Sequence, residues 1–295
     1  MIQAICPASC GELLQGWVLG GEKLISYSID CYSTVTLVEG EATSKDLYPK
    51  AYEMIKKVME YYQVSTKKSS FLNSTFNLTI KSDIPLGKGM ASSTADLAAT
   101  ALATATYLGK EITEEEIAQL CVTIEPTDST VFSKITLFDH LKGSFSRPYG
   151  VIPACQVLIL EGHERINTMD FRKINRDKMY QQQEKTLKDA LAAFELGIET
   201  NNLEEIGRAA SLSSMANQAI LYKEGLKNII DLAEKNGAVG VNVAHSGTVV
   251  GILHQQDSFE EEKFLHEIKK RHYFNNYKAI RKHRIILGGA KIIGK

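Results

Sequence analysis

The residues best suited to chemistry lie in one stretch, DIPLGKGMASSTADLAATALATA, at positions 83–105. Gly87 and Gly89 fall in a turn after the strand-like run FNLTIKS, and Ser92 and Ser93 directly precede a long run of small residues. A glycine-rich turn leading into a helix leaves backbone N–H groups free, and the helix dipole adds about half a positive charge there. Glycine lets the backbone approach a phosphate, and serine hydroxyls can bond phosphate oxygens or magnesium. This order predicts a triphosphate-binding loop.

The loop differs from the two commoner phosphate loops. A P-loop has Lys and then Ser or Thr directly after its last glycine, whereas Met90 and Ala91 stand there in this chain. A dinucleotide-binding fingerprint has a third glycine and an acidic residue after the next strand, and neither is visible. The alternative is a simple helix cap after a glycine turn. Pro85, the paired serines and the small-residue helix occur together, which favours the phosphate loop.

Three segments resemble the motifs of the GHMP kinases. PLGKGMASSTA resembles the second motif, P-x-x-x-G-L-G-S-S-A, and the match is direct at Pro85, Gly89, Ser92 and Ser93. CPASCGELLQGW, at 6–17, resembles the first motif in its homoserine-kinase-like form, P-A-T-S-A-N-L. This opening is closer still to the family members that phosphorylate L-threonine in cobalamin biosynthesis, and IEPTDS, at 124–129, fits the same subgroup. VNVAHSGTVVG, at 241–251, matches the third motif weakly, because it keeps a Ser-Gly but lacks the full glycine run.

The resemblance implies an α+β protein with the two-domain GHMP kinase fold. An S5-like N-terminal ATP-binding domain is expected over 1–150 and a ferredoxin-like C-terminal domain over 151–295, with ATP in the cleft between them. The glycine- and proline-rich segment KGSFSRPYGVIPA marks the boundary. ATP and Mg2+ are the implied cofactors. The residues expected to bind the nucleotide are Pro85, Gly87, Lys88, Gly89, Met90, Ala91, Ser92 and Ser93, although Lys88 can equally face water.

Two carboxylates near the middle of the chain are the candidate catalytic residues. The resemblance implies that Ser93 and Glu125 are magnesium ligands, and hydroxyl and carboxylate oxygens suit that ion. Asp128 follows Glu125 after a turn forced by Pro126, so it can face the incoming hydroxyl as a general base. The alternatives are a surface carboxylate at a helix end for Glu125 and a turn residue for Asp128.

Glu12 carries the prediction about the substrate. It stands where the homoserine-kinase-like motif has an Asn that holds the amino acid, and a carboxylate there can bond an ammonium group. Ser9 and Gln15 are expected in the same pocket. His245, Ser246 and Gly247 are expected to form a turn that faces the cleft, where His245 can bind a carboxylate or be structural. A salt-bridged edge residue is the alternative for Glu12.

Other candidates remain open. Asp139 and His140 are either catalytic or, as we favour, a buried structural pair, and Arg147 and Arg165 are guesses for the substrate carboxylate. The predicted reaction converts L-threonine to L-threonine O-3-phosphate for cobalamin biosynthesis. Homoserine kinase or another GHMP small-molecule kinase is the nearest alternative. A non-catalytic ATP-binding sensor is the second, and the Ser93, Glu125 and Asp128 set argues against it.

The composition excludes several other functions. The chain has 295 residues, of which 44% are hydrophobic and 23% charged, with a net charge of −1, as in an ordinary globular protein. A net charge near zero gives no overall positive potential that would attract nucleic acid or an anionic membrane. The expected partners are therefore small molecules, ATP and an amino acid. The five cysteines form no C-x-x-C pair, and Cys10 lies within the first motif. No signal peptide is visible, so a cytoplasmic location is expected. The sequence does not indicate an oligomeric state.

Periodicity predicts the elements that position these residues. In the first half, alternation predicts strands at 23–29, 33–39 and 76–82, and helical spacing predicts 47–64 and 113–125. The second of these helices starts with a capping box, because Thr113 is followed by Glu116. After residue 150 we expect a strand at 155–162, helices at 177–199, 203–218 and 224–236, a strand–turn–strand at 239–254, a helix at 258–271 and a strand at 283–293.

Overall fold

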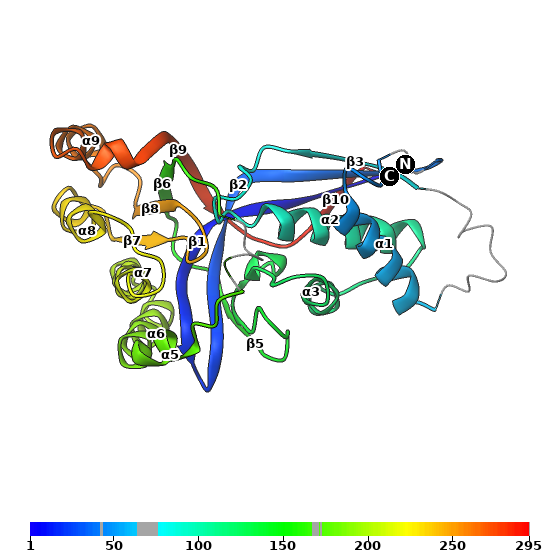
Figure 1. Cartoon of the computed structure of the whole chain (residues 1–295), viewed down its shortest axis with the longest axis horizontal. Helices are drawn as coiled ribbons and strands as arrows, with labels where there is room; N and C mark the ends of the chain where they lie inside the picture. The colour runs from blue at the N-terminus through cyan, green and yellow to red at the C-terminus, as the bar shows by residue number, and fades with distance from the viewer. Residues whose placement is uncertain (42–43, 64–75, 167–170, 172, 295) are drawn as a thin grey trace.

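The structure is a computed structural model that describes residues 1–41, 44–63, 76–166, 171 and 173–294. Its described residues form a mixed α/β protein around one sheet of ten strands (Figure 1). The strands are β1 (Ile2–Val18), β2 (Gly21–Glu39), β3 (Phe76–Ser82), β4 (Ile135–Phe138), β5 (Ser146–Gly150), β6 (Gln156–Gly162), β7 (Gly240–Val243), β8 (Val249–His254), β9 (Tyr277–Ile286) and β10 (Lys291–Gly294). The helices are α1 (Pro49–Tyr61), α2 (Ser92–Tyr107), α3 (Glu114–Val122), α5 (Asp177–Gln182), α6 (Glu184–Glu199), α7 (Leu203–Asn217), α8 (Leu226–Lys235) and α9 (Glu261–Lys270), with short 3-10 turns η2 (Ser129–Val131) and η3 (Tyr273–Asn276).

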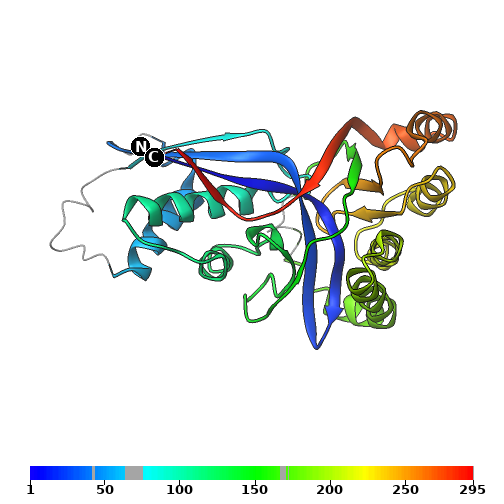
Figure 2. The same cartoon turned by 180° about the vertical axis from the view of Figure 1, so that it is seen from behind.

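The long hairpin of β1 and β2 lies at the centre of the strand pairing. The two strands pair antiparallel from Ile2↔Leu37 to Val18↔Gly21. Strand β1 also pairs with β7 and β10, and β2 also pairs with β3, β4 and β9. The hairpin therefore joins strands from both halves of the chain. The last strand returns to β1, so the two termini lie side by side (Figures 1 and 2).

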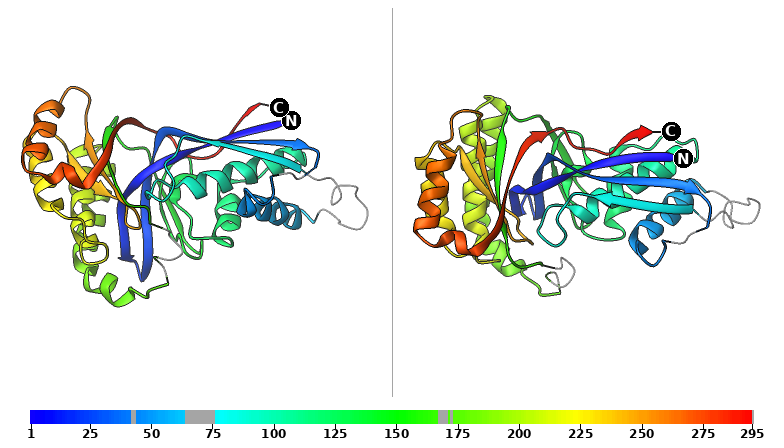
Figure 3. Two further views of the ribbon diagram at one scale, coloured as in Figure 1. Left: turned by 45° about the horizontal axis from the view of Figure 1, so that its top comes forward. Right: turned by 90° about the horizontal axis from the view of Figure 1, so that it is seen from above.

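The helices cover the sheet in two groups. Helix α2 packs on β1 and β2, and α1 and α3 pack against it. Its buried face consists mainly of alanine and threonine, so the helix lies close to the strands. Helices α6 to α9 stack in a column at the end of the molecule away from the termini (Figures 1 and 3). No helix among the described residues is long and apolar enough to cross a membrane.

Most of the predicted helices and strands are present, but some of them merge or divide in the structure. The predicted capping box of α3 is confirmed: Thr113 Oγ1 accepts from the Glu116 N–H at 3.2 Å, and the Glu116 carboxylate accepts from the Thr113 N–H at 2.7 Å. The predictions at 23–29 and 33–39 merge into β2, while 177–199 divides into α5 and α6 and 283–293 divides between β9 and β10. Strands β1, β4 and β5 were not predicted. The helix predicted at 47–64 appears as α1, and its residue 64 lies outside the described residues.

The family fold is present, and strands of both halves share one sheet. Strands β1, β2 and β9 each pair with strands on both sides of residue 150. Residues 291–294 lie beside β1, in the N-terminal half of the molecule. The division of the chain at residue 150 stays a prediction.

Candidate active site

Residues from separate parts of the chain line one pocket of about 110 Å³. It lies between the phosphate loop, β1, the segment after α3 and the turn between β7 and β8. Its predicted site residues are Glu12, Gln15, Gly87, Gly89, Met90, Ala91, Ser92, Ser93, Glu125, Asp128 and Ser246, and it also contains His140. Five predicted residues do not line it: Ser9, Pro85, Lys88, His245 and Gly247.

The phosphate loop presents the uncapped start of a helix. Helix α2 begins at Ser92, and its N-cap, Ala91, has a left-handed backbone with a φ of 57° and no side-chain cap. Gly87 and Gly89 also have positive φ, at 69° and 78°. Without a capping side chain, the first N–H groups of α2 are free for an anion. The loop therefore has the backbone geometry that a phosphate site requires.

The turn between β7 and β8 packs directly on this loop. A Cβ on Gly247 would lie 2.2 Å from the Lys88 carbonyl oxygen, and a Cβ on Gly89 would lie 2.3 Å from the Ala244 Cβ. The Thr248 N–H donates to the same Lys88 carbonyl at 3.0 Å. Close backbone packing therefore explains the glycine of the weak third motif, Gly247.

Lys88 points away from the pocket. Its Nζ donates to the carbonyl oxygens of Gly162 at 2.7 Å and His163 at 3.1 Å, and to that of Glu164. The Glu161 carboxylate is 3.9 Å away, and only 1% of the Lys88 side chain is exposed. Burial lowers the pKa of Lys88. These contacts attach the loop to the end of β6, and they give the ammonium a structural role in place of the expected phosphate contact.

Glu125 contacts the phosphate loop as the magnesium prediction requires. Ser93 Oγ donates to one oxygen of the Glu125 carboxylate, and Lys50 Nζ lies 2.6 Å from the other. The carboxylate is almost buried, with 7% of the side chain exposed. A hydroxyl and a carboxylate in contact at the start of α2 fit a magnesium ion whose other ligands are phosphate and water oxygens. Among the described residues, no three His, Cys, Asp or Glu side chains gather to hold a metal ion, so phosphate oxygens would have to complete this site.

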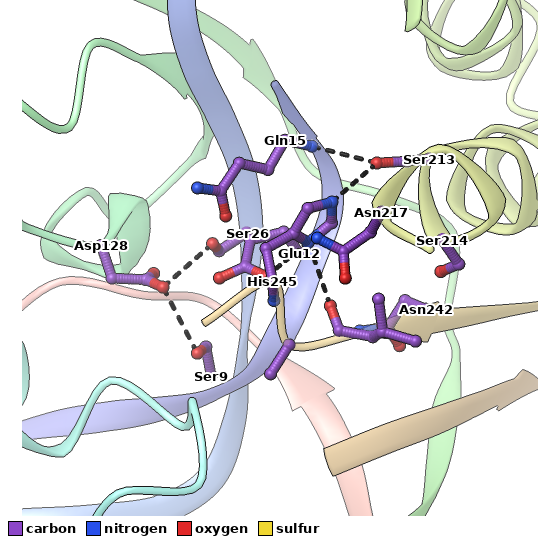
Figure 4. Close-up of polar contacts among 12 residues, drawn as sticks. Ser9, Glu12, Gln15, Ser26, Asp128, Ser213, Ser214, Asn217, Asn242 and His245 are labelled. Atoms are coloured by element: carbon purple, nitrogen blue, oxygen red, sulfur yellow. Dashed lines mark hydrogen bonds and ion pairs between the residues drawn. The ribbon is translucent and has the colours of Figure 1, made fainter. Parts of the chain in front are cut away.

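Asp128 lines the pocket, and the hydrogen-bond donors to its carboxylate are neutral. Its Oδ2 accepts hydrogen bonds from Ser26 Oγ at 3.1 Å and Ser9 Oγ at 3.4 Å (Figure 4). Its Oδ1 accepts from the Thr130 N–H at 3.0 Å. Burial and the negative charge of Glu12 raise the pKa of Asp128 to about 7. Ser9 therefore takes part in the site through this carboxylate.

Glu12 belongs to a hydrogen-bonded chain that ends on helix α7. Its Oε2 accepts from the backbone N–H of His245 at 3.0 Å and lies 2.9 Å from His245 Nδ1. His245 Nε2 lies 3.2 Å from Ser213 Oγ, which accepts from the Gln15 N–H at 3.1 Å (Figure 4). Every contact is satisfied if His245 carries its proton on Nδ1 and Ser213 donates to Nε2. His245 is thus a structural partner that orients Glu12.

The second oxygen of Glu12 is left for the pocket. The described residues donate no hydrogen bond to Oε1, and Glu12 lines the pocket. Glu12 is directly cross-strand from Ser26, whose hydroxyl bonds Asp128. Side chains of such a pair stand next to each other on one face of the sheet. The Glu12 and Asp128 carboxylates therefore face the same part of the pocket, one side chain apart.

His140 lines the pocket, and from the sequence we expected either a catalytic residue or, as we favoured, half of a buried structural pair with Asp139. Its Nε2 lies 3.3 Å from Glu22 Oε1, which also accepts from Gln15 Nε2 at 3.1 Å. Asp139 instead accepts from the N–H groups of Leu141 and Lys142, as a turn residue does. His140 is buried beside Glu22, whereas Asp139 is only half-buried and bonds the backbone of its own turn.

The two arginines suggested for the substrate carboxylate, and the cysteines, do not line the pocket. Arg147 pairs with Glu195 at 3.0 Å, outside the pocket. Arg165 is exposed and lies beside Gly87 of the loop. All five cysteines are buried and unpaired. Burial raises the pKa of Cys10 to about 12, so its thiol is not a nucleophile at neutral pH.

The sequence matches a known family of phosphotransferases. The family description "GHMP kinases N terminal domain" matches residues 50–133, and "GHMP kinases C terminal" matches residues 188–273. The chain belongs to the GHMP kinases and is an ATP-dependent small-molecule kinase.

Its relatives include two L-threonine kinases. The chain is 42% identical to that of Citrobacter freundii over 253 residues, which are 86% of each chain. It is 37% identical to that of Salmonella typhimurium over 289 residues, covering 98% of this chain and 95% of the relative. The crystal structure of homoserine kinase from Cytophaga hutchinsonii shares the fold, with a TM-score of 0.68 and 17% identity over 99% of this chain and 97% of that one.

The packing of the turn on the phosphate loop predicts the effect of Gly247→Ala. The added Cβ would lie 2.2 Å from a backbone oxygen of the loop, so loop and turn must move apart. We expect a loss of about 1–3 kcal/mol in the free energy of unfolding and a clear rise in KM for ATP. Gly21→Ala is the control, because only the end of the Lys23 side chain lies near that position. Denaturant unfolding and steady-state kinetics that leave Gly247→Ala like wild type would contradict this packing role.

Proposed function

We propose that the protein phosphorylates the hydroxyl of L-threonine with ATP, giving L-threonine O-3-phosphate and ADP. The observation that carries this proposal is the pair of carboxylates, Glu12 and Asp128, on one part of the pocket. Threonine carries its ammonium and hydroxyl on adjacent carbons, so two neighbouring carboxylates suit it. In homoserine the hydroxyl is one carbon further from the ammonium. The two related L-threonine kinases point the same way.

Each group of the pocket has a separate role in the proposed reaction. The free Oε1 of Glu12 accepts hydrogen bonds from the substrate ammonium, while His245 holds Oε2. Asp128 Oδ2 accepts the proton of the substrate hydroxyl as that oxygen attacks the γ-phosphorus of ATP. The N–H groups at the start of α2 bind the phosphates. Ser93 and Glu125 are the residues that would hold Mg2+, which neutralises charge on the phosphates when it is bound.

The proposal also covers the use of the product and the cellular compartment of the reaction. L-threonine O-3-phosphate would serve cobalamin biosynthesis, as the resemblance to the threonine-phosphorylating subgroup implies. Five buried, unpaired cysteines suit a reducing compartment, so we place the reaction in the cytoplasm.

The direct test is a comparison of acceptors. ADP release should be measured with L-threonine, L-homoserine, L-serine and mevalonate at fixed MgATP. We expect a higher kcat/KM for L-threonine than for homoserine or mevalonate, because its ammonium and hydroxyl lie on adjacent carbons and match the two carboxylates. L-serine has the same spacing, so its kcat/KM shows whether the threonine methyl group adds to recognition. A higher kcat/KM for homoserine would assign the protein to that substrate. Nucleotide binding without ADP release for any of the four would support a sensor instead.

The raised pKa of Asp128 gives a pH test of its role as base. Only the ionised carboxylate accepts a proton, so log kcat/KM for the acceptor should rise with pH up to about pH 7 and then level. Glu12→Gln removes a charge that raises this pKa, so the acidic limb should move to lower pH. Asp128→Asn should remove the limb and lower kcat by about 10²–10⁴-fold. An Asp128→Asn variant that keeps more than about a tenth of kcat would reject the base.

Glu12→Gln also tests ammonium binding. The amide keeps the shape but loses the charge, so threonine binding should weaken by about 1.5–3 kcal/mol, or roughly 10- to 150-fold. KM for ATP should stay nearly constant, because Glu12 lies on the acceptor side of the loop. Glu60→Gln is the matched control, since this side chain is 60% exposed on α1. Equal losses for both substrates would make Glu12 a structural residue.

A further inference from the structure

The Glu125 carboxylate is shared between the phosphate loop and helix α1. One oxygen accepts from Ser93 Oγ, and the other lies 2.6 Å from Lys50 Nζ. The Lys50 side chain is 49% exposed, whereas that of Glu125 is 7% exposed. A single carboxylate therefore separates a half-exposed ammonium from Ser93 in the first turn of α2. The roles proposed so far leave this ammonium without a function.

Two helix N-termini meet at this carboxylate. Lys50 is the second residue of α1, whose N-cap, Tyr48, makes no side-chain cap. Ser93 is the second residue of α2, whose N-cap also lacks a side-chain cap. Each uncapped N-terminus adds unbonded N–H groups and the positive end of a helix dipole. Together with the ammonium they make a positive region around the Glu125 carboxylate.

We propose that Lys50 binds the polyphosphate chain of the nucleotide. The inference rests on the proposed function, in which Glu125 turns to a divalent cation. A divalent cation and an ammonium compete for the same carboxylate oxygens, and the divalent charge wins at close range. Lys50 has four flexible carbons and a half-exposed side chain, so Nζ can move from Glu125 to a nearby phosphate oxygen. An ammonium binds phosphate as a point charge and needs no fixed fork geometry.

The contact with Glu125 explains why the ammonium stays near the loop before nucleotide binds. Lys56 and Lys57, on the same helix, pair instead with Glu60 and Glu53 one turn away. Only Lys50 among these three lysines contacts a residue of the pocket. The ion pair therefore holds the ammonium at the place where the phosphates arrive.

Titration calorimetry with AMP, ADP and ATP in Mg2+, without acceptor, tests this inference. Lys50→Met should bind ADP and ATP about tenfold or more weakly and AMP as wild type does, because Lys50 contacts only the phosphates beyond the first. Lys50→Arg should restore most of the affinity, since it keeps the charge. Lys56→Met is the matched control: that side chain is 73% exposed on the same helix. Thermal unfolding without ligand checks folding, and Lys50→Gln replaces Lys50→Met if the latter is unstable.

The outcomes separate this inference from the proposed function. Wild-type affinity of Lys50→Met for ADP and ATP would overturn the inference, and so would an equal loss for AMP, ADP and ATP. Because no acceptor is present, a wrong assignment of threonine leaves the result unchanged. A wild-type protein that binds none of the three nucleotides would overturn the nucleotide-dependent function itself.

Discussion

The contact between Gly89 and Gly247 is the constraint on which the site depends. Here the phosphate loop, from one half of the chain, meets the β7–β8 turn, from the other, with no side chain between them. The turn donates two N–H groups to the Lys88 carbonyl, and the Lys88 ammonium bonds carbonyl oxygens at the end of β6. The loop is therefore fixed on both sides. Because the same turn carries His245, fixing the loop also places Glu12.

Three carboxylates face one small pocket, and their neighbours give them different properties. Glu125 lies against an ammonium and a hydroxyl, so its charge is balanced at the start of α2. Glu12 is bonded to an imidazole and a backbone N–H, which fix one oxygen and leave the other for a ligand. Asp128 receives only hydroxyl and N–H donors in the described contacts, and burial beside Glu12 raises its pKa. The carboxylate with the weakest compensation is thus the one suited to accept a proton.

Local signals in the sequence predicted the elements that they specify directly. The capping box at Thr113, the glycines of the phosphate loop and the strand-like runs of β3 and β6 depend on neighbouring residues, and the structure contains all of them. The breaks in 177–199 and 283–293 were missed, because tertiary contacts and not composition end those elements. Strand β1 was missed because it is buried almost throughout, so its residues show no alternation of polar and apolar positions.

By itself the sequence determined the chemistry available: a glycine loop with two serines and three acidic residues in short motifs. It also determined a net charge too small to attract nucleic acid. These follow from residue type and spacing, which act over a few positions. Only the tertiary structure decided which groups meet, because those pairs are far apart in the chain. It directed Lys88 to β6, joined His245 to Glu12, brought His140 into the pocket and placed Lys50 on Glu125. No local pattern records such contacts, since they depend on how the β1–β2 hairpin and its helices pack.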